Sequence, residues 1–325
     1  MSKFTNSQNI ALPLAVWLAH DTYKGIKAPN AISATSLMKP LKETILAARL
    51  ENGGGDVDIA TRKASAKGTA YHNAIEAAWK SEDLPQILES LSVPKRVREN
   101  IRINPKEHDP DVLNIYLEKR SERQLGNWMI NGMYDLVFDG EVHDYKSTGT
   151  YGYVKGNKVD DYILQGSIYR WLNPEIITAD TITIHYIFTD WSKLESIKKK
   201  EYPQSDMISK QYRLLGLSET QAWINSRLAI LSGFATLPEE ELPPCTDKEL
   251  WRGPPTFKYY KNPNSTNRST ANFTDQNKAF NRLAEDGHVG IVKVVHDTPK
   301  RCNFCTALAG CEQARSYINQ GILKI

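Results

Sequence analysis

The stretch that decides the fold is Asp135-Leu-Val-Phe-Asp-Gly-Glu-Val-His-Asp-Tyr-Lys146, in which two runs of strand-forming residues flank an Asp-Gly pair. An Asp-Gly pair between such runs is the strongest short-range signal for a β-hairpin with a two-residue turn. A two-residue turn at Asp139-Gly140 also fixes the register of the strands, and it places Asp135 opposite Asp144. The sequence therefore predicts a hairpin that brings two carboxylates face to face.

These two carboxylates indicate a metal site. Like charges on directly opposed strand residues destabilise a sheet unless something compensates for them. A hard cation such as Mg²⁺ compensates, because it takes oxygen ligands from one or two carboxylates and leaves positions for phosphate and water. The two-residue period of a strand places Lys146 on the face of Asp144 and turns Tyr145 away. This set suits metal-dependent phosphodiester hydrolysis, in which Lys146 holds the attacking water or offsets negative charge. An exposed hairpin whose acid-x-Lys triplet arose by chance is the alternative.

Two predicted helices supply further candidate residues at the spacing of one helical turn. His72 and Glu76 lie beside an apolar stripe and could direct a nitrogen and an oxygen ligand at the hairpin. On the later helix, Gln165 and Tyr169 can donate hydrogen bonds to phosphate oxygens, and a tyrosine ring can also stack on a base. A partly buried histidine with a structural role is the alternative for His72. The stripe consists of Tyr71, Ala74, Ile75, Ala78 and Trp79.

The rest of the pattern predicts an α/β core that begins with a helical N-terminal segment. Strands are expected at 112–119, 124–130, 133–138, 141–147 and 181–189. Helices are expected at 33–50, 68–79, 84–101, 159–172 and 218–234. Three consecutive glycines within 51–56 lack the Lys-Ser/Thr of a phosphate-binding loop and predict a flexible connection. The stretches 237–255 and 259–269 are rich in Pro, Asn and Ser, and they predict a long loop or insertion.

Composition limits the class of protein. The chain has 325 residues, of which 40% are hydrophobic and 9% aromatic, enough to bury a core, so a disordered or fibrous protein is excluded. We expect a single domain over 1–325. No apolar run approaches the ~20 residues of a membrane span, and the N-terminus lacks a basic-then-apolar leader. A cytoplasmic protein without membrane contact is therefore expected.

The distribution of charge is more informative than its total. The formal net charge of +3 permits a polyanionic partner without demanding one. Between Arg252 and Arg301, nine basic residues stand against four acidic ones, a local excess of five positive charges. This segment is a candidate face for a nucleic-acid backbone, and an ordinary solvated surface is the alternative.

Five short segments follow one another along the chain: Ile32-Ser-Ala-Thr-Ser-Leu37, Gly68-Thr-Ala-Tyr-His-Asn-Ala-Ile-Glu76, Gly132-Met-Tyr-Asp135, Asp144-Tyr-Lys146 and Gln165-Gly-Ser-Ile-Tyr169. This series resembles the motifs of RecB-like nucleases in the PD-(D/E)XK superfamily, phage-encoded exonucleases above all. The resemblance implies a PD-(D/E)XK core, a mixed central sheet flanked by helices, with its motifs within 32–190. It also implies a metal-dependent DNA exonuclease of the host-cell cytoplasm, serving phage recombination, replication or processing. DNA and a phage single-strand annealing protein are the implied partners.

Site residues follow from the same resemblance. It implies that His72, Asp135, Asp144 and the main-chain carbonyl of Tyr145 hold Mg²⁺ or Mn²⁺. Lys146 is the implied catalytic lysine, and Gln165 and Tyr169 are the implied Q-x-x-x-Y pair. Family members differ in whether an acid at the position of Glu76 reaches the metal, so its role stays open.

All four cysteines lie in the last quarter of the chain, at Cys245, Cys302, Cys305 and Cys311. A cytosolic protein rarely uses its only cysteines for disulfides, so a metal or cluster site is expected. The spacing of the cysteines alone does not distinguish a Zn²⁺ site from an iron–sulfur cluster. Unrelated buried thiols are the alternative. The late C-x₂-C-x₅-C resembles the iron–sulfur-stapled subgroup of RecB-like nucleases, which favours a 4Fe-4S cluster over Zn²⁺. In many of those proteins the first cysteine precedes the nuclease motifs. Cys245 follows them, so the cluster would staple only 237–325.

Three other functions fit parts of the sequence. A catalytically silent DNA-binding or scaffold protein would keep the fold, but the complete Asp135, Asp144 and Lys146 set argues against it. A redox or iron-sensing protein would use the cysteines and leave the nuclease motifs unexplained. An endonuclease of the same superfamily would share every motif, so the sequence does not separate it from an exonuclease.

Overall fold

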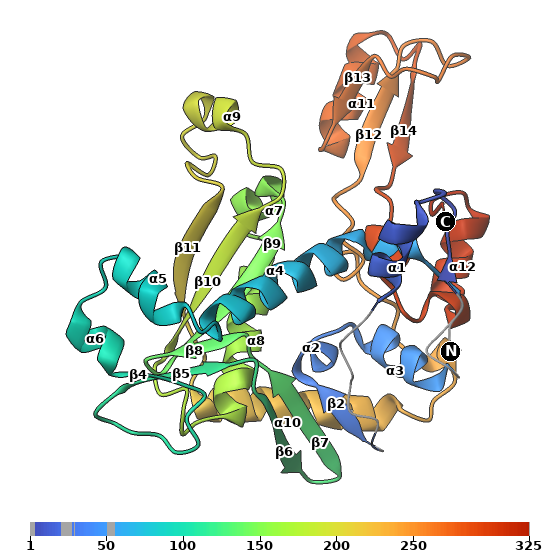
Figure 1. The fold of residues 1–325 in the computed structure, drawn as a ribbon. Coiled ribbons are helices and arrows are strands. Elements are labelled where there is room, and N and C mark those ends of the chain that lie inside the picture. The colour runs from blue at the N-terminus through green and yellow to red at the C-terminus, as the bar shows by residue number, and fades with distance from the viewer. Residues whose placement is uncertain (1–3, 21–27, 29, 51–55, 325) are drawn as a thin grey trace. The chain divides into compact units, whose positions relative to one another are not determined.

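The computed structural model describes residues 4–20, 28, 30–50 and 56–324 (Figure 1). The glycine-rich stretch at 51–55 lies outside these residues. The chain divides into two compact units. Residues 4–39 and 58–233, here called the motif unit, contain every nuclease-like motif. Residues 1–3, 40–57 and 234–325, here called the cysteine unit, contain all four cysteines.

A six-stranded mixed sheet organises the motif unit, with the strand order β11-β10-β9-β8-β5-β4. The pairs β9–β10 and β4–β5 are parallel, whereas β10–β11, β5–β8 and β8–β9 are antiparallel. This confirms the predicted α/β class with a mixed central sheet. The strands are β4 (Ile101–Ile103), β5 (Leu113–Leu117), β8 (Leu136–Phe138), β9 (Glu141–Thr148), β10 (Thr181–Phe188) and β11 (Met207–Arg213).

A second sheet of the motif unit has the order β2-β7-β6. It consists of β2 (Ala31–Ser33), β6 (Arg120–Leu125) and β7 (Trp128–Met133). The prediction of one strand over 124–130 was wrong, because the chain reverses between Leu125 and Trp128, which pair across a hairpin. Gly126, at φ +57°, adopts the left-handed conformation that this reversal requires.

Helices flank the sheets. In the motif unit they are α1 (Leu12–Ala19), α2 (Ala34–Leu37), α4 (Lys63–Trp79), α5 (Leu84–Ser90), α6 (Lys95–Glu99), α7 (Thr150–Lys155), α8 (Val159–Leu172), α9 (Lys193–Lys198) and α10 (Leu217–Phe234), with a 3₁₀ turn at Ile59–Arg62. The predicted bounds of α8 are confirmed. This helix packs closely on the sheet at Gly166, where an added Cβ would lie 2.6 Å from the Ile182 side chain. Only a glycine permits that approach.

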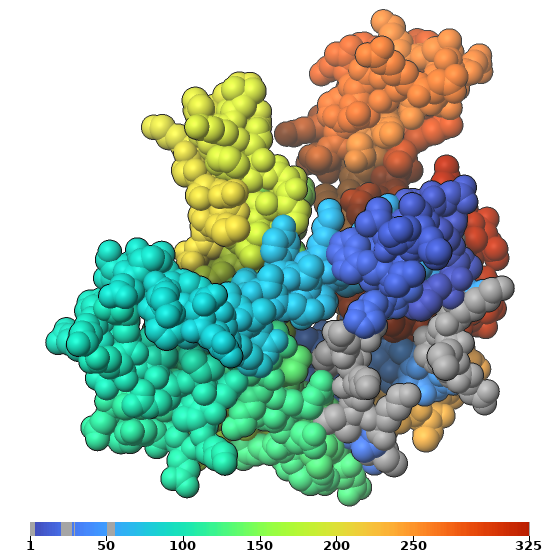
Figure 2. All heavy atoms as spheres, viewed as in Figure 1, coloured from blue at the N-terminus to red at the C-terminus, as the bar shows by residue number. Residues whose placement is uncertain are grey.

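The helix predicted over 68–79 is confirmed as part of α4, and the apolar stripe from Tyr71 to Trp79 contains no fully buried residue. Its surface is visible in the space-filling view (Figure 2). Trp79 of this stripe is partly buried and packs against the core residues Ile115, Leu117 and Leu136. The core itself is formed by strand and α8 residues, among them Ile115, Val137, Val142, Ile168 and Ile182.

The cysteine unit contains more regular structure than the sequence predicted. Its helices are α3 (Leu41–Arg49), α11 (Gln276–Glu285) and α12 (Glu312–Asn319), and its sheet of β12 (Thr256–Tyr260), β13 (Ala271–Phe273) and β14 (Ile291–Val295) has the order β13-β12-β14. Short 3₁₀ turns lie at Glu239–Glu241, Lys300–Phe304 and Leu308–Gly310; the two-residue strands β1 (Phe4–Thr5) and β3 (Val57–Asp58) complete the chain. The stretch 259–269, predicted as part of a long loop or insertion, begins within β12, where Tyr259 and Tyr260 are buried.

The helical segment predicted at 33–50 is two helices, because Pro40 lies between α2 and α3. Proline lacks the N–H that a continuing helix needs. Among the residues that the structure describes, no helix is long and apolar enough to cross a membrane.

Candidate active site

The β8–β9 hairpin has the register that the sequence predicts. Phe138 pairs with Glu141, Val137 with Val142 and Leu136 with His143. Asp139 and Gly140 form the turn at φ +48° and +76°, as a type I′ turn requires. Asp135 directly precedes β8, and Asp144 lies within β9. Sequence and turn chemistry therefore determine the frame of the candidate site.

Asp144 and Lys146 form a buried ion pair. Asp144 is 2% exposed, and its Oδ2 lies 2.5 Å from Lys146 Nζ. That oxygen is buried, and among the described residues its partner is the Lys146 ammonium. Burial raises the pKa of Asp144, and the charge of Asp135 adds to the rise while Lys146 opposes it. Burial alone would lower the pKa of Lys146, but the two carboxylates outweigh it and raise that pKa, which keeps the ammonium charged.

His72 and Asp135 form a second pair beside the first. His72 Nδ1 lies 3.3 Å from Asp135 Oδ1, and its Nε2 lies 3.0 Å from the main-chain oxygen of Tyr145. The Tyr145 N–H in turn donates to Asp135 Oδ2 at 2.8 Å. Burial lowers the pKa of His72, but the hydrogen bond and charge of Asp135 outweigh it and raise the pKa to about 9. These contacts bring His72 of α4 onto the hairpin.

A chain of hydrogen bonds links Lys146 to α8. Lys146 Nζ donates to Gln165 Oε1 at 3.1 Å, and Gln165 Nε2 donates to Tyr169 Oη at 2.7 Å. Tyr169 is 5% exposed, and its ring packs where Gly132 leaves room. Because this ring is buried, the structure gives no support for base stacking by Tyr169. Gln165 instead orients Lys146 directly, and Tyr169 orients Gln165.

In this arrangement the candidate metal ligands are engaged in hydrogen bonds and ion pairs within the site. Among the residues that the structure describes, no group of three or more His, Cys, Asp or Glu side chains is placed to hold a metal ion. The contacts given above explain this, since His72 bonds Asp135 and the Tyr145 carbonyl while Asp144 is paired with Lys146. The oxygen and nitrogen donors nevertheless come together at one point of the motif unit.

The cysteine unit gathers its four thiols. Cys245, Cys302, Cys305 and Cys311 all line one pocket, together with apolar residues such as Leu250. All four are free thiols. Burial raises the pKa of Cys245 to about 12 and that of Cys305 to about 11, so without a metal these groups are neutral at physiological pH. No cysteine pair or closed metal site is formed.

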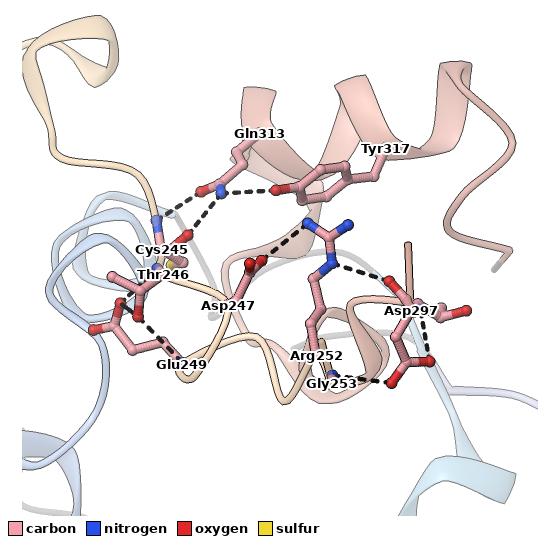
Figure 3. Close-up of polar contacts among 10 residues, drawn as sticks. Cys245, Thr246, Asp247, Glu249, Arg252, Gly253, Asp297, Gln313 and Tyr317 are labelled. Carbon is pink, nitrogen blue, oxygen red and sulfur yellow. Dashed lines mark hydrogen bonds and ion pairs between the residues drawn. The ribbon is translucent and has the colours of Figure 1, made fainter. Parts of the chain in front are cut away.

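Hydrogen bonds from a side chain beside this pocket hold the backbone of Cys245 (Figure 3). Gln313 of α12 accepts from the Cys245 N–H at 2.8 Å and donates to the Cys245 carbonyl at 3.0 Å. Arg301, next to Cys302, forms an ion pair with Glu43 of α3 at 2.9 Å. Distant segments of the unit are therefore tied together at the pocket.

Comparison with known proteins gives distant likenesses only. No known protein family and no curated protein matches the sequence. The crystal structure of SSO0001 matches 63% of this chain and 78% of that chain, at 14% identity and a TM-score of 0.38. A phage-related exonuclease from Haemophilus somnus 129PT matches 37% of this chain and 60% of its own, at 17% identity and a TM-score of 0.24. Likenesses of this size carry no argument about activity.

Sequence reasoning missed two residues at the site. Glu118, at φ +43°, directly follows β5, and its N–H donates to the Asp135 carbonyl at 3.0 Å. Burial raises the pKa of Glu118, with further rises from Glu76 and Asp135. Tyr162 lies under Lys146, whose Nζ is 5.2 Å from the ring centroid. Its position three residues before Gln165 could have identified it, whereas Glu118 carries no local signal.

Proposed function

We propose that this chain hydrolyses phosphodiester bonds of DNA with the help of a divalent cation, and that it acts as an exonuclease. The carrying observation is the buried carboxylate of Asp144 paired with Lys146, directly beside the pair of Asp135 and His72. Gathering four ionisable groups, one of them buried and three partly buried, is costly for a fold, and such clusters are typical of functional sites.

The donor set fits a hard cation. Asp135 and Asp144 supply carboxylate oxygens, Tyr145 a carbonyl oxygen and His72 a nitrogen, and a bound cation would share the buried Asp144 carboxylate with Lys146. When bound, Mg²⁺ or Mn²⁺ would polarise the phosphoryl group and acidify a bound water. Mn²⁺ is expected to substitute well because it accepts nitrogen ligands more readily than Mg²⁺.

The chain's own residues then have separate tasks. Lys146 carries a fixed positive charge, which offsets the negative charge that develops on the phosphoryl oxygens. Gln165 accepts from Lys146 and is itself held by Tyr169, so the ammonium is restricted to one orientation. Asp135 holds His72 through Nδ1, which leaves the other imidazole nitrogen toward Tyr145.

The test uses linear and circular DNA incubated with the full chain in Mg²⁺ or in EDTA. An exonuclease degrades linear DNA in Mg²⁺ and leaves covalently closed circles intact, whereas nicked or linearised circles would make it an endonuclease. The variant Asp144→Asn should abolish hydrolysis. Asp139→Asn makes the same chemical change at the turn of the same hairpin, and it should remain active. Absence of hydrolysis by the wild type with either metal contradicts the proposal.

A 4Fe-4S cluster is the proposed occupant of the cysteine pocket. Four thiols lining one pocket of the cysteine unit support an inorganic centre, and four thiolates suit either such a cluster or Zn²⁺. Anaerobically prepared protein should be brown, with broad absorbance at roughly 400 nm as in other iron–sulfur proteins. A colourless protein with one bound zinc would refute the iron–sulfur cluster but would support an inorganic centre held by the cysteines. A preparation with neither iron–sulfur nor zinc would refute the cluster and the inorganic centre alike.

A further inference from the structure

A small module within the cysteine unit has two different sides. Residues 256–295 form the sheet β13-β12-β14 with α11 packed on it (orange in Figure 1). Tyr259 is fully buried, and its hydroxyl donates to Asp286 at the end of α11 at 2.8 Å. Tyr259 therefore faces the helix. Because strand residues alternate between faces, Lys258 lies on the opposite side, here called the sheet side.

A row of three polar residues crosses the sheet side. Lys258 of β12 pairs with Asn272 of β13 and with Lys293 of β14, and Asn272 and Lys293 are exposed. Neither lysine forms an ion pair with any residue that the structure describes. The contacts of Lys293 Nζ are Thr266 Oγ1 at 3.4 Å and the Tyr260 ring. Two directly opposed lysines repel each other, so this row destabilises the sheet unless an anion lies across it.

Charge is segregated between α11 with its ends and the strands with the loop 261–270. Across this division the hydrogen bond from Tyr259 and the charge of Lys261 lower the pKa of Asp286. The helix α11 and its ends carry two basic and three acidic residues: Lys278, Arg282, Asp275, Glu285 and Asp286. Several of these neutralise one another, since Arg282 pairs with Glu285 and Asp286. The three strands and the loop 261–270 carry four basic residues and no acidic one: Lys258, Lys261, Arg268 and Lys293.

We propose that the sheet side of this module binds the phosphate backbone of a nucleic acid, as a contact additional to the one proposed at Asp144. Two opposed ammonium groups match the closely spaced charges of a phosphodiester chain, and Asn272 adds a neutral donor beside them. The absence of carboxylates on this side removes competition for the lysines. The choice of nucleic acid as the polyanion rests on the proposed function, whereas the charge segregation is independent of it.

The experiment measures binding of the full chain to labelled single- and double-stranded oligonucleotides in EDTA, over a series of salt concentrations. Each neutralised phosphate contributes about 0.7 (single strand) to 0.9 (duplex) to the slope of log affinity against log salt. Lys258→Gln/Lys293→Gln should therefore lower that slope by about 1.4 to 1.8 and weaken binding several-fold. The matched control, Lys278→Gln/Lys324→Gln, removes the same charge from the same unit and should leave the slope unchanged.

One further variant and two further measurements separate the possible outcomes. Lys258→Arg/Lys293→Arg preserves the charge and should preserve the slope, while urea unfolding shows whether each variant keeps its fold. An unchanged slope in the glutamine variant, or an equal loss in the control, overturns the inference. Hydrolysis in Mg²⁺ is measured separately. A chain that binds DNA through these lysines without cleaving it refutes the proposed function alone, and a chain that cleaves with an unaltered salt slope refutes this inference alone.

Discussion

At the scale of single residues, burial decides how the candidate site behaves. Asp144 is 2% exposed, and its partner Lys146 is 21% exposed at the side chain. A lysine on an exposed hairpin could be removed with little effect on stability. Truncating Lys146 instead leaves an uncompensated carboxylate in the interior.

Lys146→Ala should therefore lose both activity and stability. We expect hydrolysis to fall by roughly 100-fold or more, because a fixed positive charge at the reacting phosphoryl group is removed. The free energy of unfolding should fall by about 3 kcal/mol, as is usual when one partner of a buried ion pair is deleted. Urea denaturation and a nuclease assay measure the two effects. In Asp144→Asn the lysine can still reach Gln165, so this variant should lose activity with a smaller loss of stability.

At the scale of elements, the β8–β9 turn sets the register that brings the site together. Gly140 has φ +76°, and an added Cβ would lie 2.3 Å from Thr178 Oγ1. Thr178 is exposed and its side chain can move aside. The positive φ of Gly140 is therefore harder to relieve than the close approach to Thr178.

Gly140→Ala should destabilise the motif unit by about 2 kcal/mol, of which left-handed strain supplies about 1 kcal/mol. Adding Thr178→Ala should recover only the steric part. Thermal unfolding of the two single variants and the double variant forms a mutant cycle that separates these contributions. Full recovery in the double variant would show that the positive φ costs nothing.

Asp297 ties two segments of the cysteine unit together (Figure 3). Its carboxylate accepts from Lys300 Nζ at 3.0 Å, from the Gly253 N–H at 3.1 Å and from the Thr298 N–H at 2.9 Å. The hydrogen bond from Lys300 and then that from Gly253 lower the pKa of Asp297 below its usual value of 3.8. A carboxylate of this kind stabilises the fold while it is ionised.

The stability of the cysteine unit should thus depend on acid through Asp297. Because the folded pKa is the lower one, the contribution is fully present above the unfolded pKa and is lost as pH falls through the folded pKa. Asp297→Asn should reduce the difference between unfolding midpoints measured near pH 5 and below roughly pH 3. If the variant and the wild type show the same loss, other carboxylates account for the acid dependence.

At the scale of the whole molecule, the chain has two units with different means of stabilisation. The motif unit contains most of the largest buried side chains, including Trp171, Ile115 and Ile182. The cysteine unit has a smaller core around Leu250, Cys302, Ala314 and Leu323, against which Cys245 and Cys311 pack. A bound inorganic centre would therefore matter to one unit only.

Removal of that centre should lower the melting temperature of the cysteine unit and leave that of the motif unit unchanged, because metal-binding free energy stabilises the unit that holds the ligands. Calorimetry before and after chelation should show one shifted and one constant transition. Limited proteolysis should then cut between Leu237 and Arg301. Cys302→Ser should reproduce the shift without a chelator, and equal shifts of both transitions would contradict the idea of separate stabilisation.

The sequence by itself determined the features that depend on neighbours along the chain. Asp139-Gly140 specified the turn and register, and the 3.6-residue period of Val159–Leu172 specified α8 with Gln165 and Tyr169 on one face. Tertiary structure alone decided what depends on distant contacts. It placed Glu118 and Tyr162 beside the hairpin and buried the ring of Tyr169. It also formed the sheet of 256–295, whose first strand overlaps the stretch 259–269 that was predicted as part of a loop or insertion. The reason is physical: turn and helix geometry follow from local dihedral preferences, whereas burial, pKa and strand pairing between distant segments arise only when the chain has packed.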